Sequence, residues 1–155
     1  MILSRTSQYA IQAMIYMALQ PTGAPVLNRD VAGRLNVPAP YLAKILQNLS
    51  RNGLLYSFRG RLGGFCLRED AADMSLMQLL QLTEGVDFTQ SCLLGLKKCS
   101  DETACPMHVK WLPIKEQIIA MLNQMRLHDL AGAVKEGRYR LTDMPAAAWQ
   151  AEGIV

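Results

Sequence analysis

A change in the spacing of apolar residues near position 53 constrains the fold of this chain more than any other feature. Before it, apolar side chains recur every three to four residues, the period of amphipathic helices. Three such segments are predicted as helices: residues 4–20, 28–35 and 40–52. After it, residues 54–58 and 65–69 read as short strands around the basic, glycine-rich turn RGRLGG. Helices followed by a two-stranded hairpin predict a mainly α fold that contains a winged helix-turn-helix domain with a two-stranded wing.

Residues with capping preferences mark the ends of these helices. Asn28 is expected to cap the second helix, and Pro40 suits the first position of the third. Gly53 is expected to end the third helix as a C-terminal cap. Ser75 is expected to cap a further helix that runs to about Thr83.

The charges of the chain are divided unevenly between its two halves. Residues 1–68 hold eight lysines and arginines against one acid, Asp30, whereas residues 69–155 hold eight against twelve acids. A basic half of this kind is the footprint expected of a protein that binds the phosphate backbone of double-stranded DNA. A solvated basic face is the alternative, although a single acid in 68 residues is unusual for one.

The side chains expected to contact DNA lie on the third helix and in the wing. A recognition helix places its N-terminal residues in the major groove, where Lys44 can reach a phosphate or a guanine edge. The predicted DNA-binding residues are Tyr41, Lys44, Gln47, Arg59 and Arg61. Core packing is an equal alternative for Tyr41, and a solvated hairpin turn is the alternative for the two arginines.

Three cysteines and a histidine fall within 17 residues, in and just after a segment without clear periodicity, residues 85–106. Cys92, Cys99, Cys105 and His108 are the ligand types of a metal or iron–sulfur site. A disulfide framework is disfavoured in a cytosolic chain, and zinc sites more often use paired C-x2-C motifs. Nothing marks a base or an oxyanion hole for a catalytic cysteine. An iron–sulfur cluster therefore fits best, and Cys66, in a predicted strand, is not counted as a ligand.

The C-terminal half contains an apolar ladder whose members are spaced alternately by four and three residues. The ladder consists of Met107, Trp111, Ile114, Ile118, Met121 and Met125. A seam of this type favours a long dimerisation helix and a homodimer, and packing on the chain's own domain is the alternative. Pro113 predicts that the helix either begins near Trp111 or bends there. A short helix follows, in which His128 is expected to be structural.

These patterns divide the chain into four parts. The parts are a DNA-binding domain (1–84), a cysteine-bearing cluster loop (85–106), a dimerisation helix with a short helix (107–135) and a mobile tail (136–155). No apolar run approaches the roughly 18 residues that a membrane-spanning helix needs. We therefore expect a cytoplasmic protein without a membrane partner, and one that is not an enzyme.

Two segments and the cysteine spacing together resemble a known family. The segments LSRTSQYAIQAMIYMA and VPAPYLAKILQNLSRNGLLYSFRGRLGGFCL, with the C-x6-C-x5-C loop, are similar to the iron–sulfur-cluster winged-helix transcription regulators, the family of the IscR, NsrR and RirA repressors. The resemblance covers roughly residues 1–135. It implies a homodimer with a long C-terminal dimerisation helix and a cluster that sets DNA affinity.

The resemblance also bears on the fourth ligand. His108 matches the histidine ligand of the IscR type, whereas Gln8 stands where the NsrR type has an acidic ligand from the partner subunit. The first cysteine spacer is six residues here, while some members have five or seven. The implied ligand set is the three cysteines with His108, and the cluster is either 2Fe–2S or 4Fe–4S.

The function expected from the sequence is a DNA-binding transcriptional repressor that senses iron or cluster supply, redox state or nitric oxide through its cluster. The first alternative is a DNA-binding regulator whose cysteines sense by thiol oxidation or hold zinc. An alternative of another class is a protein-interaction adaptor or an enzyme component that uses the winged helix for protein contacts.

Overall fold

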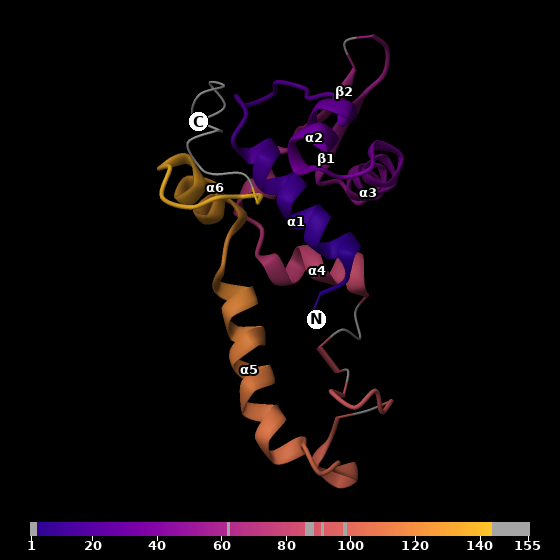
Figure 1. Ribbon diagram of the computed structural model, residues 1–155, viewed down its shortest axis with the longest axis vertical. Helices are drawn as coiled ribbons and strands as arrows, with labels where there is room; N and C mark the ends of the chain where they lie inside the picture. Colours follow the sequence, from indigo (N-terminus) through magenta and orange to yellow (C-terminus); the bar gives the residue numbers. More distant parts are fainter. Residues whose placement is uncertain (1–2, 62, 86–88, 91, 98, 144–155) are drawn as a thin grey trace.

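The computed structural model describes residues 3–61, 63–85, 89–90, 92–97 and 99–143. Its elements, in chain order, are α1 (Arg5–Ala18), α2 (Asn28–Leu35), α3 (Ala39–Arg51), β1 (Leu55–Phe58), β2 (Gly64–Leu67), η1 (Glu69–Asp73), α4 (Leu76–Glu84), η3 (Asp101–Thr103), α5 (His108–Gln124) and α6 (Leu127–Lys135). Figure 1 shows α1–α3 and the wing at one end of the molecule, and α5 leading away from them. The expected fold class, a mainly α winged helix-turn-helix with a long C-terminal helix, is confirmed.

The helix-turn-helix consists of α2, a tight turn and α3. Asn36 adopts a left-handed conformation with φ of 54° and ends α2, and Val37 is buried directly after it. The prediction that Asn28 caps α2 is wrong, because Leu27 occupies the cap position and Asn28 is the first helical residue. The Asn28 side chain instead donates a hydrogen bond of 2.9 Å to the carbonyl of Ala39, which joins the starts of the two helices.

The end of α3 follows the sequence prediction closely. Gly53 has a φ of 77°, which glycine adopts without steric cost, and its N–H donates to the carbonyl of Ser50. The N–H of Leu54 donates to the carbonyl of Leu49, which completes a Schellman motif. The start differs by one residue, since α3 begins at Ala39 and Pro40 therefore takes the second helical position.

The wing is a hairpin in which β1 and β2 pair antiparallel, with Leu55 opposite Leu67 and Phe58 opposite Gly64. Its second strand is tied to the loop before α2, because Val26 and Phe65 exchange two backbone hydrogen bonds of 2.8 and 2.9 Å. Gly64 makes this approach possible: a Cβ there would lie 2.2 Å from the Val26 carbonyl oxygen.

The core joins segments from both ends of the chain. Met14 of α1, Leu46 of α3, Leu79 of α4 and Leu127 of α6 belong to one cluster of buried side chains. Thus α6, which follows the long α5, packs against α1 (Figure 1). The expectation of a mobile tail over residues 136–155 falls largely outside the described residues, which end at position 143.

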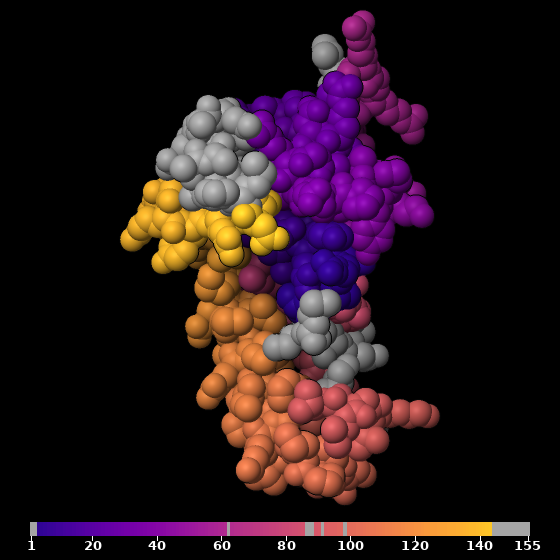
Figure 2. Space-filling view, in the orientation of Figure 1, coloured from indigo at the N-terminus to yellow at the C-terminus, as the bar shows by residue number. Residues whose placement is uncertain are grey.

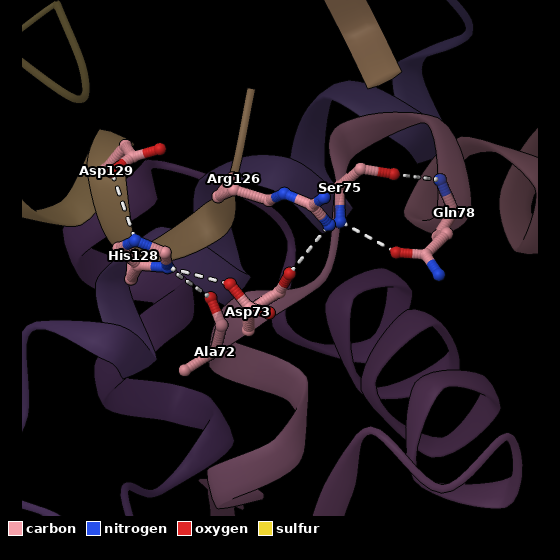
Figure 3. A network of polar contacts seen from close by, with 7 residues as sticks. All are labelled: Ala72, Asp73, Ser75, Gln78, Arg126, His128 and Asp129. Atoms are coloured by element: carbon pink, nitrogen blue, oxygen red, sulfur yellow. Dashed lines mark hydrogen bonds and ion pairs between the residues drawn. The ribbon is translucent and has the colours of Figure 1, made fainter. Parts of the chain in front are cut away.

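A short antiparallel contact fixes the start of α6 against the start of α4. Ser75 caps α4, as predicted; the structure shows that the cap is a capping box with Gln78, and that Ser75 also forms a β-bridge with Arg126. Figure 3 shows this network, in which Arg126 donates to the backbone carbonyl of Asp73 at 3.0 Å. The His128 ring lies beside it, 3.6 Å from the Asp73 carboxylate, in agreement with a structural role.

The helix α5 begins at His108 and continues through Pro113, so the first of the two predicted alternatives, a start near Trp111, is wrong. The N–H of His108 donates to the carbonyl of Cys105, and that of Trp111 to the carbonyl of Met107, so helical hydrogen bonds begin well before the proline. No described helix is both long and apolar enough to cross a membrane.

The apolar ladder of α5 is divided between two environments. Ile118 packs with Met77, Leu80 and Leu122 in a second small core between α4 and α5. Ile114 and Met121, in contrast, keep 50 % and 52 % of their surface exposed. Packing on the chain's own domain therefore accounts for one side of the helix, and the other side remains open.

Candidate functional site

The recognition helix α3 separates its buried and polar faces clearly. Its apolar face is in the core and comprises Leu42, Ile45, Leu46 and Leu49. Lys44 and Gln47, predicted to contact DNA, are exposed. The helix therefore presents a lysine and an amide to solvent, which are side chains able to bind phosphates and base edges.

Tyr41 lies at the edge between the core and the exposed face of α3. Its ring makes an edge-to-face contact with Tyr9 at 5.9 Å between ring centroids. Its hydroxyl shares a hydrogen bond of 2.6 Å with the hydroxyl of Thr6, in the first turn of α1. The side chain is still 38 % exposed, so Tyr41 both joins α3 to α1 and reaches the surface where DNA is expected.

The wing carries Arg59 and Arg61 at its tip, and both are exposed. Gly60 between them has a φ of 99°, a conformation that side chains other than glycine rarely adopt. Figure 2 shows the wing projecting from the body of the molecule. The two arginines therefore lie exposed at the tip of a projecting hairpin, where minor-groove binding is expected of them.

The four predicted ligands come together in two pairs at the start of α5. The sulfur atoms of Cys92 and Cys105 are 4.0 Å apart, and the Cys99 sulfur is 3.4 Å from Nδ1 of His108. Cys92 and His108 are buried, with 8 % and 4 % of their surface exposed. Within the described residues, no group of three or more histidine, cysteine or acidic side chains is arranged to hold a single metal ion.

The surroundings of Cys92 favour its thiolate. Hydrogen bonds from the backbone of Leu94 and Leu96 and from the Cys105 thiol, with the charge of Lys115, lower the pKa of Cys92, and they outweigh the opposing effect of burial. Thiolate is the form of cysteine that binds metals and iron–sulfur clusters.

Cys66 has the opposite environment and lies elsewhere in the fold. It is buried in β2, and burial raises the pKa of its thiol. In Figure 1 β2 lies at the end of the molecule opposite the cysteine-bearing segment. The structure therefore agrees with leaving Cys66 out of the ligand set.

The sequence prediction missed Asp101, whose carboxylate lies 2.9 Å from Nε2 of His108. Asp101 is in the short helix η3, which the sequence shows only as three polar residues between two of the cysteines. Its place between predicted ligands is the one sequence feature that could have indicated it.

A second missed group links the end of α4 to the first helix. Glu84, the last residue of α4, accepts a hydrogen bond of 2.7 Å from the N–H of Ser4. The adjacent Thr83 shares a hydrogen bond of 2.6 Å with the Ser7 hydroxyl. Burial opposes ionisation of Glu84, but the hydrogen bonds from Ser7 and Ser4 outweigh it and lower its pKa. The first turn of α1 thus contacts both the end of α4 and, through Thr6, the recognition helix.

Comparison with known proteins identifies the family. The family described as Rrf2, iron-dependent transcriptional regulator, matches residues 3–133. A protein of Aquifex aeolicus named as an HTH-type transcriptional regulator is 33% identical over 132 residues, which are 84% of this chain and 91% of that protein. The HTH-type transcriptional regulator IscR of Salmonella paratyphi B is 28% identical over an alignment of 160 residues, covering 100% of this chain and 96% of that protein.

A solved structure adds to these relatives. CymR, the global cysteine regulator of B. subtilis, superposes with a TM-score of 0.68 and 25% identity, covering 84% of this chain and 95% of that one. These relatives are transcriptional regulators and not enzymes, as expected for this chain. The helix-turn-helix, the wing and the match over most of its length therefore show that the chain belongs to the Rrf2 family of transcriptional regulators.

Proposed function

We propose that this Rrf2-family regulator binds operator DNA with an affinity that is set by an iron–sulfur cluster held by Cys92, Cys99, Cys105 and His108. The proposal rests on one observation: these four side chains form two close pairs near the start of α5, Cys92 with Cys105 and Cys99 with His108. A cluster offers several irons, so two separated pairs suit it better than they suit a single ion. The relative IscR, which aligns along the whole chain, supports the same choice.

The donor set fits either a 2Fe–2S or a 4Fe–4S cluster. The hydrogen bonds that stabilise the Cys92 thiolate favour iron binding, because thiolates are the ligands of such clusters. A bound cluster would supply a centre whose loss or oxidation changes the state of the loop. In this proposal the residues of the chain hold the cluster and connect the loop to α1 and α5.

We propose that DNA is bound by Tyr41, Lys44 and Gln47 on α3 and by Arg59 and Arg61 in the wing. The exposure of Lys44, Gln47 and both arginines, and the net positive charge of residues 1–68, support this surface. In this proposal residues 1–84 bind DNA, residues 85–106 bind the cluster, and α5, within residues 107–135, forms the dimer. The protein is proposed to be cytoplasmic.

We propose a homodimer formed through the open side of α5. Met107, Ile114 and Met121 are exposed on it and are spaced seven residues apart, the repeat with which two helices pack along a common seam. We propose that a second copy of the chain packs on this side of α5. Two-fold symmetry would pair the face with itself and would place two recognition helices on one DNA duplex.

The contacts at the start of α1 provide a connection between the two proposed sites. The loop leaves α4 directly after Glu84 and Thr83, which bond to Ser4 and Ser7. The same turn of α1 bonds to Tyr41 through Thr6. A change in the loop can therefore tilt α1 and the recognition helix together, which would convert a local event into a change of DNA affinity.

The experiment is anaerobic purification followed by DNA titration. Wild type is expected to be coloured and to contain iron and sulfide, and Cys99→Ala to lose the visible absorption while remaining folded. Cys66→Ala is the matched control and is expected to keep the chromophore. DNA affinity, measured by fluorescence anisotropy, is expected to differ between the cluster-bound protein and Cys99→Ala. Full iron and sulfide content in Cys99→Ala would contradict the assignment.

Thiol oxidation is the second candidate, and the 4.0 Å between the sulfurs of Cys92 and Cys105 favours it. An oxidant such as a peroxide would take two electrons and two protons from the thiols as their S–S bond forms. The likeness to CymR, which has been solved in an oxidized form from Staphylococcus aureus, also supports thiol chemistry. Colourless anaerobic protein that gains a Cys92–Cys105 disulfide with peroxide, detected by mass spectrometry, would favour this candidate over the cluster.

A further inference from the structure

His108 is held on both sides of its ring. Nδ1 faces the Cys99 sulfur at 3.4 Å, and Nε2 faces the Asp101 carboxylate at 2.9 Å. The His108 side chain is 5 % exposed and that of Asp101 is 90 % exposed, so the imidazole lies between a cysteine inside the site and a carboxylate at its outer edge.

We propose that Asp101 is the positioning residue for His108: it fixes the Nε2–H tautomer, so that the lone pair of Nδ1 points toward the Cys99 sulfur. This inference rests on the proposed cluster site for its consequence, although the ring orientation can be tested without a cluster.

The tautomer follows from the chemistry of the carboxylate. An ionised aspartate accepts hydrogen bonds and cannot donate them, so the proton of this 2.9 Å contact belongs to Nε2 of His108. In the neutral ring the other nitrogen, Nδ1, then carries a lone pair. Metal-binding histidines commonly donate their second N–H to a carboxylate or a carbonyl, which fixes the ring and increases its basicity.

The local backbone supports this role for Asp101. Asp101 opens η3, and the hydroxyls of Ser100 and Thr103 share a hydrogen bond of 3.0 Å around it. His108 is fixed from the other direction, because its N–H donates to the carbonyl of Cys105. The neighbouring Glu102 is also exposed and acidic, and no hydrogen bond or ion pair to it is found in the described residues, so it provides a matched control.

The first test uses the full-length, metal-free protein. Nitrogen-15 chemical shifts of the His108 ring, recorded at about pH 8.5 where histidine is ordinarily neutral, report which nitrogen is protonated. Wild type, Asp101→Asn and Glu102→Ala are expected to hold the Nε2–H tautomer, since the asparagine amide oxygen also accepts from Nε2. Asp101→Ala is expected to give a mixture. A wild-type ring protonated at Nδ1, or an unchanged ring in Asp101→Ala, would overturn the proposal.

The second test uses protein reconstituted anaerobically with iron and sulfide. With excess chelator, Asp101→Ala is expected to lose its chromophore roughly 10-fold faster than wild type, the lower end of the effect of such partners on metal affinity. Glu102→Ala is expected to match wild type, and Asp101→Asn to fall between them. The reduction potential of Asp101→Ala is expected to rise, because a negative charge near the cluster has been removed.

The two tests separate this inference from the function on which it rests. Wild-type protein that takes up no iron and sulfide would refute the cluster, whereas the tautomer test would still decide the role of Asp101 at the ring. A cluster in Asp101→Ala with the lifetime and potential of wild type would overturn the role of Asp101 toward the cluster.

Discussion

Replacing Ile114 with aspartate is expected to weaken self-association of the protein without unfolding it. Ile114 lies on the open side of α5 with half of its surface exposed, so the folded monomer can accept a carboxylate there. Ile118, one turn further on, is a poorer choice, because it packs against Met77 and Leu80 and its replacement would also damage the core.

The size of the effect follows from the area that the dimer would cover. Burying a whole isoleucine side chain contributes about 1.5–3 kcal/mol, so covering the exposed half of Ile114 contributes about 1 kcal/mol. Two-fold symmetry doubles this to about 2 kcal/mol, which corresponds to a roughly 30-fold weaker dimer. Desolvation of two carboxylates and their mutual repulsion increase the loss further.

Sedimentation equilibrium over a range of concentrations measures the dissociation constant, and thermal unfolding checks that the monomer is intact. Asn123→Asp is the matched control: nine residues further on, it adds the same charge on the opposite side of α5. An Ile114→Asp dissociation constant equal to that of wild type and of Asn123→Asp would refute the proposed interface.

Three further results are expected. Arg59→Ala should weaken duplex binding by about 1–3 kcal/mol and reduce the salt dependence by about one phosphate contact in anisotropy titrations; unchanged affinity would remove the wing from the interface. Gly64→Ala should destabilise the protein by more than about 2 kcal/mol in urea denaturation, because its Cβ meets the Val26 carbonyl, whereas Gly33→Ala, in an open helical position, should stabilise it by about 0.5–1 kcal/mol; equal stabilities would contradict the close approach. Glu84 has a lowered pKa in the folded state, so its contribution to stability is present above the ordinary carboxyl value of 4.5 and is lost as the pH falls through the folded value; the stability difference between wild type and Glu84→Gln should therefore shrink on acidification, and a pH-independent difference would count against it.

Local sequence features predicted the helices and strands of residues 4–69 within two residues. The capping box at Ser75 and the glycine after α3 mark helix ends, because capping depends on hydrogen bonds between near neighbours in the chain. Asn28 shows the limit of this reasoning. Its side chain has a cap's chemistry, but it bonds to Ala39 across the helix-turn-helix, a partner that exists only once α2 and α3 have packed.

The candidate ligands could also be named from the sequence, because three cysteines and a histidine at such spacing are the ligand types of metal and iron–sulfur sites. Their pairing could not. Cys92 lies beside Cys105, and Cys99 beside His108, because of the path that the backbone takes through η3 into α5. The same path brings Asp101 to the ring of His108, where no periodicity or motif could have placed it.

The sequence by itself determined the winged helix-turn-helix, the basic half of the chain and the residues that we propose as cluster ligands, since period, charge and residue type are properties of short segments. Only the tertiary structure decided which side of α5 is core and which is open. It also decided that Ser4 meets Glu84, 80 residues away, and that Thr6 meets Tyr41. These contacts depend on how whole elements pack, and packing is set by the combined burial of side chains from α1, α3, α4 and α6.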